Sequence, residues 1–355
     1  MQIRKSINVL RSRIMRSITK NIGVTSVEKH GKQIGHIDIR NILISRPNHR
    51  LGNLLMLTPL LQEIAETFPD AKVDLFVKGS IAPILFKHYA NVNQIIQLPK
   101  RPFKHFLQYQ RGWMAMRKNH YDLVINAVNH SSSGRLSASL ANATYKLFGD
   151  VDGPVRLVYP DSRHMAKHPV YSFRQFIKQL RRPEIERPIQ SLNLMLSDEE
   201  IAEGKSILDG LVSEDKKTIS IFTYATGVKC YSKTWWLEFY EGLKAAYPDF
   251  NIIEILPVEN VSQIDFKAPV FYSKDIRKIG AVIANTVVFI GADSGMMHLA
   301  SAVHTPTMGL FKVTNPATYQ PYNNKSKGIT TNDHTVDDCV KCIYEILEAY
   351  NLSVV

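Results

Sequence analysis

The stretch V-V-F-I-G-A-D-S-G-M-M-H-L-A-S-A, residues 287–302, decides the fold of this 355-residue chain. Its first residues form an apolar run that ends at Gly291, and such a run is typical of a strand buried on both faces of a sheet. A carboxylate follows at Asp293, and Ser294 is a residue type that favours the N-cap of a helix. A buried strand that passes directly into a helix predicts an α/β domain with a parallel sheet.

The turn between this strand and its helix is a candidate phosphate site. Gly295 has no side chain, so a ligand can approach the backbone there. The N–H groups of the first helical turn have no partner within the helix, and the helix dipole favours an anion beside them. Asp293 would then accept hydrogen bonds from sugar hydroxyls next to the phosphate. The alternative interpretation is an ordinary capped helix with Asp293 in a surface turn.

Short strands separated by helix-length segments extend this pattern along the chain. Strands are predicted at residues 38–45, 72–77, 93–98 and 122–126, and again at 218–224, 251–256, 270–272, 287–291 and 307–311. A polar, Pro-containing stretch at residues 183–195 separates the two series. The sequence therefore predicts two Rossmann-like, doubly wound α/β domains facing a central cleft, residues 38–187 and 188–355. Ligands of such sheets bind beyond the carboxyl ends of the strands.

A second polar loop follows a predicted strand in the C-terminal series. It reads T-Y-A-T-G-V-K-C-Y-S-K-T-W-W, residues 223–236. Thr223 and Thr226 would line a phosphate path, and either Lys229 or Lys233 would supply the cation. The paired tryptophans are predicted to pack the following helix rather than to stack on a ligand.

A third loop, R-P-N-H-R-L-G-N-L-L-M-L-T-P-L-L at residues 46–61, follows the first predicted strand. Gly52 permits a tight turn, and Asn53 would cap or precede a helix predicted over residues 54–68. The Asn53 amide makes hydrogen bonds but does not take up a proton at neutral pH. Three loops at strand ends, drawn from both halves, predict one binding site more specifically than any one of them alone.

The chain is basic, with 44 Lys and Arg against 32 Asp and Glu and a net charge of +12. Half of this charge lies in residues 1–20, which contain no acid. At 100° per residue, Ile3, Ile7, Leu10, Ile14, Ile18 and Ile22 form one apolar stripe. This pattern predicts a basic amphipathic helix over residues 1–22 that binds an anionic membrane surface, or else packs on its own domain. No aromatic residues interleave the charges, which disfavours nucleic acid as a partner.

Two more stretches are rich in Lys and Arg. Residues 100–120 read as a basic helix or loop near a sheet edge. Residues 163–187 would either face an anionic acceptor or form a solvated helix face.

The remaining composition indicates an intracellular location. Three cysteines are too few for a disulfide framework. No run resembles a signal peptide or a membrane span, so we expect a cytoplasmic protein. Cys339 and Cys342 have metal-ligand spacing, but no second Cys or His pair accompanies them, so no metal site is expected.

Four stretches together resemble glycosyltransferase family 9, the lipopolysaccharide heptosyltransferase family. They are R-L-G-N-L-L-M-L-T-P-L-L (50–61), Y-D-L-V-I-N (121–126), K-T-W-W (233–236), and G-A-D-S-G-M-M-H-L-A (291–300) with T-P-T-M-G-L-F (305–311). The resemblance covers roughly residues 38–350 in the same order. Residues 1–37 look like an N-terminal extension.

The resemblance implies a GT-B fold and an inverting, metal-independent transfer without a cofactor. The donor would be a nucleoside-diphosphate sugar, heptose-like, bound on the C-terminal domain. The acceptor would be a lipopolysaccharide-type or other anionic glycolipid or oligosaccharide bound on the N-terminal domain. A cytoplasmic enzyme peripheral to the inner face of the cytoplasmic membrane is the expected setting.

The resemblance also implies residue roles. Donor-binding residues would be Thr226, Lys233, Glu259, Asp293, Ser294, Gly295, Met296, Met297 and His298, and acceptor-side residues would be Arg50 and Gly52. Lys233 and Thr226 would contact phosphate, the backbone at 294–297 would hold the diphosphate, and Glu259 would hold the ribose.

One departure from the family concerns catalysis. The family usually has an Asp, the expected general base, where this chain has Asn53. An amide cannot take the proton of the acceptor hydroxyl. His49, four residues earlier, is the nearest side chain able to replace it, and the alternative is an ordinary loop histidine without a catalytic role. The alternatives are a non-catalytic sugar-nucleotide binding protein and a nucleotide-sugar epimerase or hydrolase on the same fold.

Overall fold

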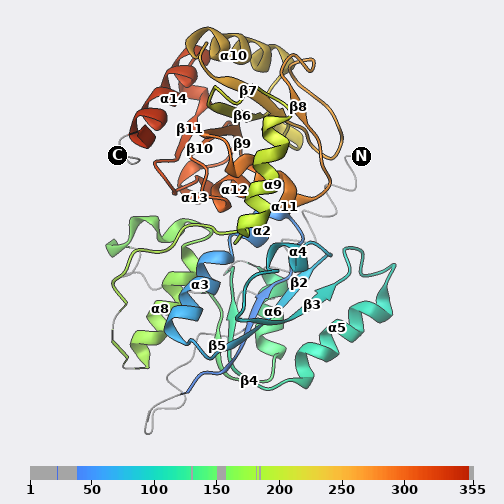
Figure 1. The fold of residues 1–355 in the computed structure, drawn as a ribbon. Coiled ribbons are helices and arrows are strands. Elements are labelled where there is room, and N and C mark those ends of the chain that lie inside the picture. The colour runs from blue at the N-terminus through green and yellow to red at the C-terminus, as the bar shows by residue number, and fades with distance from the viewer. Residues whose placement is uncertain are drawn as a thin grey trace. The chain divides into compact units, whose positions relative to one another are not determined.

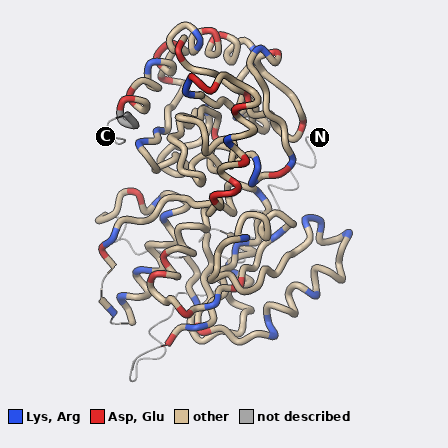
Figure 2. The backbone as a smooth tube through the Cα atoms, viewed as in Figure 1, with Lys and Arg blue, Asp and Glu red and all other residues tan. Residues whose placement is uncertain are grey.

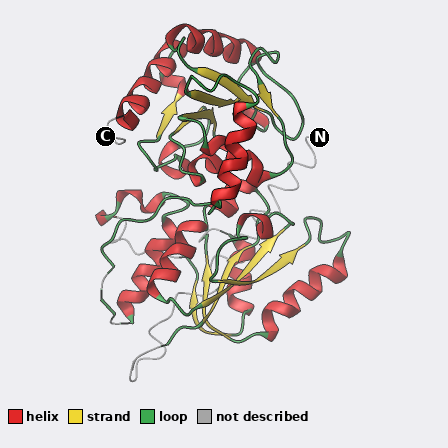
Figure 3. Ribbon diagram, viewed as in Figure 1, coloured by secondary structure: helices red, strands yellow, loops and turns green. Residues whose placement is uncertain are grey.

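The computed structural model describes Ile22 and residues 38–128, 131–149, 157–180, 182–183 and 185–351 (Figure 1). Of the predicted extension, residues 1–37, only Ile22 is described, so the amphipathic helix predicted over residues 1–22 lies outside the described residues. The colouring by secondary structure in Figure 3 shows two sheets, each flanked by helices. The predicted α/β class is confirmed.

The N-terminal sheet has five described strands, all parallel, in the order β3-β2-β1-β4-β5. The strands are β1 (Asn41–Arg46), β2 (Lys72–Lys78), β3 (Val92–Leu98), β4 (Tyr121–Asn126) and β5 (Ala143–Leu147). The helices of this half are α3 (Thr58–Thr67), α4 (Ala82–Leu85), α5 (Phe106–Lys118), α6 (Ser132–Leu140) and α8 (His168–Gln179), with the 3-10 turn η2 (Pro160–Arg163). β1 and β2 are almost wholly buried, because their apolar residues face helices on both sides of the sheet.

The C-terminal sheet has six described strands, also parallel, in the order β11-β10-β9-β6-β7-β8. The strands are β6 (Thr218–Phe222), β7 (Asn251–Ile255), β8 (Val270–Phe271), β9 (Val288–Ala292), β10 (Thr307–Phe311) and β11 (Lys327–Thr330). Around them lie α9 (Asp198–Asp209), α10 (Lys233–Ala246), α11 (Ile276–Ala284), α12 (Gly295–Ala302), α13 (Pro316–Tyr319) and α14 (Val336–Asn351), with η3 (Gly227–Lys229) and η4 (Thr331–Asp333). Trp236 and Phe239 of α10 are fully buried, and Trp235 stacks on Phe239, so the tryptophans pack the helix as predicted.

The chain forms two compact units, and each of them is built from three separate segments of the sequence. The first comprises the described residues up to His49, Pro59–Pro83 and Tyr89–Gln190. The second takes Arg50–Thr58, Ile84–His88 and the described residues from Ser191 onward. The predicted boundary lay between residues 187 and 188. The two short segments that join the second unit were not expected from the sequence.

The prediction of one continuous helix over residues 54–68 is wrong, because two separate helices cover this region. Helix α2 (Leu51–Leu55) begins three residues earlier, and α3 starts anew at Thr58. Asn53 therefore lies inside α2 instead of capping or preceding a helix, and Arg50 is the N-cap residue. Pro59, the second residue of α3, has no N–H to donate and so favours a new helix start at this point.

Arg277, in the first turn of α11, joins the short segment Ile84–His88 to the linker before α9 within the second unit. Its Nε and Nη2 atoms each donate to the Glu200 carboxylate at 2.6 Å. Its guanidinium also reaches three backbone oxygens, those of Ile84, Leu194 and Met195. The hydrogen bonds from Arg277 hold the pKa of Glu200 at about 2, against an ordinary value of 4.5.

We predict that Arg277→Met lowers the free energy of unfolding by about 3–5 kcal/mol, because it removes the positive charge paired with the Glu200 carboxylate and the hydrogen bonds to three carbonyls in a largely buried site. A depressed carboxyl pKa contributes stability above pH 4.5 and loses it as the pH falls towards 2. The difference between variant and wild type in urea unfolding should therefore shrink over that interval. Lys278→Met is the control and should leave the urea midpoint almost unchanged, since its pair with Glu203 is exposed and screened by solvent. An equal loss in both variants would contradict the prediction.

Candidate functional site

The C-terminal sheet has its topological switch point between β6 and β9. From β6 the chain moves outward through β7 and β8, and from β9 it moves the other way through β10 and β11. The loops that leave two such neighbouring strands diverge, and the space between them is where open α/β sheets bind ligands. The loop after β6 begins at Thr223, and the loop after β9 begins at Asp293.

An ion pair joins these two loops. Lys229, at the end of η3, donates from Nζ to Asp293 Oδ2 at 2.5 Å. Thr314, from the loop after β10, donates its hydroxyl to the same oxygen at 2.5 Å. Asp293 is 5% exposed, and the ammonium of Lys229 also lies 5.8 Å from the Tyr319 ring centroid. Residues of two other loops of the same sheet thus converge on the Asp293 carboxylate.

The other predicted lysine points elsewhere. Lys233 is the first residue of α10, and its Nζ pairs with Asp265 on the surface, where both side chains are about half exposed. Of the two alternatives that the sequence left open, the structure brings Lys229 to Asp293. The sequence suggested neither Thr314 nor Tyr319, although both follow the predicted strand at residues 307–311 within a few residues.

Thr223 does not line a phosphate path, which corrects the expectation from sequence. It is buried, and its hydroxyl donates to Glu254 Oε1 at 2.5 Å. Ser262 donates to the other carboxylate oxygen at 2.6 Å. Burial raises the pKa of Glu254, despite both hydroxyls. This cluster stabilises the base of the loop and leaves Thr226 as the exposed threonine.

The start of α12 has the form of an anion site. Ser294 occupies the N-cap position, as predicted, but its side chain makes no capping hydrogen bond. Its Oγ is buried and has no hydrogen-bond partner among the described residues. The N–H groups of the first turn lack intrahelical partners by the geometry of any α-helix. A ligand oxygen placed here would satisfy both the hydroxyl and the N–H groups.

Helix α2 packs against this same end of α12. A Cβ atom added to Gly52 would lie 2.4 Å from Cδ2 of His298, and one added to Gly295 would lie 3.1 Å from Cβ of Leu51. Neither position therefore accommodates a side chain without movement. The structure brings the predicted residues Gly52, Asn53 and Arg50 into the second unit, beside the α12 helix that carries Ser294–His298.

The remaining predicted donor residues differ in accessibility. Met297 and His298 are buried, so they contribute packing and backbone, while Met296 is half-buried. Thr226 is the exposed N-cap residue of η3, at the switch point. Glu259 is exposed in the turn after β7, the strand next to β6.

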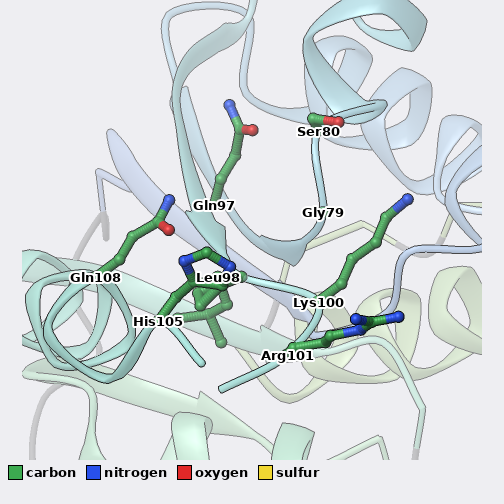
Figure 4. Close-up of a pocket in the computed structure, with 9 residues that line it drawn as sticks. Gly79, Ser80, Gln97, Leu98, Lys100, Arg101, His105 and Gln108 are labelled. Atoms are coloured by element: carbon green, nitrogen blue, oxygen red, sulfur yellow. The ribbon is translucent and has the colours of Figure 1, made fainter. Parts of the chain in front are cut away.

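His49 lies in the first unit, beside a basic pocket. Gly79 has a positive φ of 81°, and a Cβ atom there would lie 3.0 Å from both His49 Cβ and Lys100 Cε. The pocket, about 470 Å³, opens where β2 and β3 end and is lined by Gly79, Ser80, Gln97, Leu98, Pro99, Lys100, Arg101, His105 and Gln108. In Figure 4, Lys100 and Arg101 lie on one side of it, with Gln97, His105 and Gln108 on the other.

The basic stretch at residues 163–187 is largely engaged within its own unit. Arg174 and Arg187 both bind Glu63, a buried carboxylate of α3. Lys167 binds Asp161, and Arg182 stacks on Phe68. Most of this stretch therefore stabilises the fold of its own unit.

The described residues offer neither a metal cluster nor a membrane span. No group of three or more His, Cys, Asp or Glu residues in the described part of the chain is placed to hold a metal ion. In the same part, no helix is long and apolar enough to cross a membrane.

Two parallel, doubly wound sheets, one with a candidate anion site at its switch point, define an α/β protein with two Rossmann-like folds. Residues 269–345 match the model of glycosyltransferase family 9 (heptosyltransferase). Lipopolysaccharide heptosyltransferase 3 of Escherichia coli strain K12 is 22% identical over 285 residues, covering 76% of this chain and 82% of that protein. The family match and this relative support a glycosyltransferase enzyme of family 9, heptosyltransferase-like, which confirms the resemblance recognised in the sequence.

Solved structures agree on the fold. The family 9 glycosyl transferase from Veillonella parvula DSM 2008 has a TM-score of 0.64 at 14% identity, covering 89% of this chain and 99% of that one. The E. coli heptosyltransferase WaaC with ADP has a TM-score of 0.60 at 16% identity, covering 87% and 99%. The predicted GT-B fold is therefore confirmed.

We predict that Gly52→Ala disrupts the contact of α2 with α12, because the added methyl group would overlap the His298 ring. The expected cost is about 1–3 kcal/mol of unfolding free energy. Gly242→Ala on α10 is the matched control: its methyl group would sit 3.5 Å from Val340 Cγ2, an ordinary contact, and alanine favours the helix. Urea unfolding of both variants tests this, and an unchanged Gly52→Ala midpoint would contradict it.

Proposed function

We propose that this protein is an inverting, metal-independent glycosyltransferase. It moves a heptose-like sugar from a nucleoside-diphosphate sugar to a lipopolysaccharide-type or related cell-envelope glycolipid. The observation that carries the proposal is the convergence of Lys229, Asp293 and the buried Ser294 hydroxyl at the switch point of the C-terminal sheet. The names of the relatives, lipopolysaccharide heptosyltransferase 3, support the choice of sugar and acceptor.

Each group at this site has a role in the departure of the diphosphate. The acceptor hydroxyl attacks the anomeric carbon from the face opposite the diphosphate, so the configuration inverts. The bond from that carbon to the diphosphate oxygen breaks, and its electron pair leaves with the diphosphate. The N–H groups of α12, the Ser294 hydroxyl and the Lys229 ammonium stabilise the charge that develops there. No metal ion is required for this, because the helix end and the lysine supply the positive potential.

Asp293 serves a second purpose in the proposed mechanism. One of its oxygens accepts from Lys229 and Thr314, which fixes the carboxylate in place. Its other oxygen is then oriented to accept hydrogen bonds from the donor sugar. The Lys229 ammonium has three hydrogens, so it can bind Asp293 and phosphate together.

The two lysines give a direct test of donor binding. Lys229→Met should weaken ADP binding by about 10–100-fold, because it removes a charge-assisted hydrogen bond and leaves the Asp293 carboxylate to repel the diphosphate. Lys233→Met is the matched control and should change the affinity by less than about twofold, since an exposed surface pair contributes little. Isothermal titration with ADP, the nucleotide that accompanies WaaC in its solved structure, measures both. The opposite ranking would return the phosphate contact to Lys233.

The acceptor is proposed to place an anionic group in the pocket at the ends of β2 and β3. Lys100 and Arg101 provide positive charge there, and His105 adds a hydrogen-bonding ring. Phosphate and carboxylate groups of a glycolipid core are suitable ligands for such a set. This acceptor assignment depends on the first unit alone and is independent of the donor site.

His49 is proposed as the general base in place of the family's Asp. His49→Ala should lower kcat by about 100-fold or more while ADP affinity stays unchanged, because a positioned base contributes 10²–10⁴-fold. Asn53→Asp, which restores the family residue at the third position of α2, should restore turnover in that background. Release of ADP from ADP-heptose with a lipid acceptor reports both variants.

Two outcomes would change the proposal. Unchanged turnover in His49→Ala would remove His49 as the base. A wild type that binds ADP but is inert, together with an active Asn53→Asp variant, would favour the non-catalytic sugar-nucleotide binding protein instead.

The proposed setting is the cytoplasmic face of the cytoplasmic membrane, where a glycolipid acceptor is available. Residues 1–22, with their six Lys and Arg residues, are proposed to attract the protein to the anionic lipids of that face.

A further inference from the structure

Helix α5 and the loop before it carry an unusual combination of side chains. Phe103, Phe106, Leu107 and Met114 are 85%, 57%, 73% and 60% exposed. The cations Lys100, Arg101, Lys104, Arg111, Arg117 and Lys118 are exposed as well. We call these ten side chains the α5 face.

The α5 helix is apolar on two sides. Its inner side packs on the edge strand β3 and on the core, where Met116 is fully buried. The ring centroids of Trp113 and Phe76 are 5.2 Å apart. At 100° per residue, Leu107 and Met114 lie about 20° apart on the opposite side, with Arg117 on one flank and Arg111 on the other. The outer apolar residues therefore do not belong to the core.

The charge around this face is of one sign. Residues 75–121 contain eight Lys and Arg residues and no Asp or Glu. Figure 2 shows this excess of positive charge along α5, where the tube has blue segments for Lys and Arg and no red segments for Asp and Glu. With residues 1–20 this segment carries +14, so the rest of the chain has a net charge of −2. The basic character of the protein is confined to these two segments.

We propose that the α5 face docks on an anionic lipid bilayer. An apolar centre flanked by Lys and Arg is the pattern of a helix that lies in the interface, with its apolar side chains among the acyl chains and its cations at the headgroups. The face carries two exposed aromatic rings, Phe103 and Phe106, but aliphatic Leu107 and Met114 hold its centre. Nucleic acid is therefore a poorer fit, because base stacking uses a surface of successive aromatic rings. An acidic protein partner would match the charge but has no other support in the structure.

The basic pocket supports the same occupant. Its lining includes Lys100 and Arg101 of the α5 face and Gln108 of α5 itself, so the pocket opens beside the docking face. A lipid-borne acceptor held in the bilayer would meet it there. Only this role of the pocket rests on the proposed function; the exposure and the charge stand without it.

Vesicle partitioning of the full chain tests the proposal. Leu107→Ser/Met114→Ser should weaken partitioning into phosphatidylcholine–phosphatidylglycerol vesicles by about tenfold or more. Arg111→Gln/Arg117→Gln/Lys118→Gln should do the same and should reduce the salt dependence of the α5 contribution, since it removes three of the six cations of the face. None of these five residues lines the pocket, so ADP affinity and thermal unfolding should stay at wild-type values. The control Leu157→Ser/Val158→Ser alters an equally exposed apolar pair elsewhere in the same unit and should change partitioning by less than about twofold.

A second parent variant, altered in residues 1–22, separates the contribution of that segment to vesicle binding from the contribution of the α5 face. In the full chain with Arg11→Gln/Arg13→Gln/Arg16→Gln, binding to anionic vesicles should weaken but remain, and each of the two α5 variants should weaken it further by about tenfold or more. Partitioning that is unaffected by the α5 variants in both backgrounds overturns the proposal. So does binding of an oligonucleotide, but not of vesicles, that depends on the α5 face. Neither result bears on ADP binding, so the proposed function stands or falls separately.

Discussion

The close contact between the Gly52 backbone and the His298 ring is the constraint on which the site depends. Since no Cβ fits at Gly52, the start of α2 can reach α12 only with glycine there. Because of this contact, Arg50–Thr58 belongs to the C-terminal unit. The strand β1, which precedes this segment in the chain, belongs to the N-terminal sheet. His49 stays behind, against Gly79 of the first unit. One short loop thus supplies residues to both units, and its two neighbouring catalytic candidates, His49 and Asn53, have different surroundings.

The sequence predicts the central strands well and misses two of the edge strands, for a physical reason. Strands buried on both faces, such as β10 at Thr307–Phe311, are continuous apolar runs and were predicted with those bounds. β5 and β11 lie at sheet edges, are partly exposed and have no such run, and both were missed. The break between α2 and α3 was missed because the apolar residues continue through it.

The site residues illustrate a different limit. Spacing along the chain placed Lys229 and Lys233 in the same loop but could not say which carboxylate each would meet. Ser232 caps α10 by accepting from the Trp235 N–H, and this fixes Lys233 in the first helical turn, where Asp265 is its partner. Lys229 lies in a 3-10 turn that leads to Asp293. The choice depends on acids from other loops, which only the folded structure brings within reach.

The charge distribution has a consequence for how the protein works as a whole. In the proposed function, the protein binds one substrate, the nucleotide sugar, from water and the other, the glycolipid acceptor, at a lipid bilayer. The proposed donor site would bind the first with a single lysine, a serine hydroxyl and a helix end, all within a unit that is not otherwise basic. The basic excess is instead concentrated in residues 1–20 and in residues 75–121, which include α5 and the lining of the pocket. Positive charge spread evenly would bind the diphosphate product as readily as the lipid surface. In the proposed function, positive charge confined to these segments favours the bilayer at the acceptor pocket and leaves the proposed donor site free to release its product.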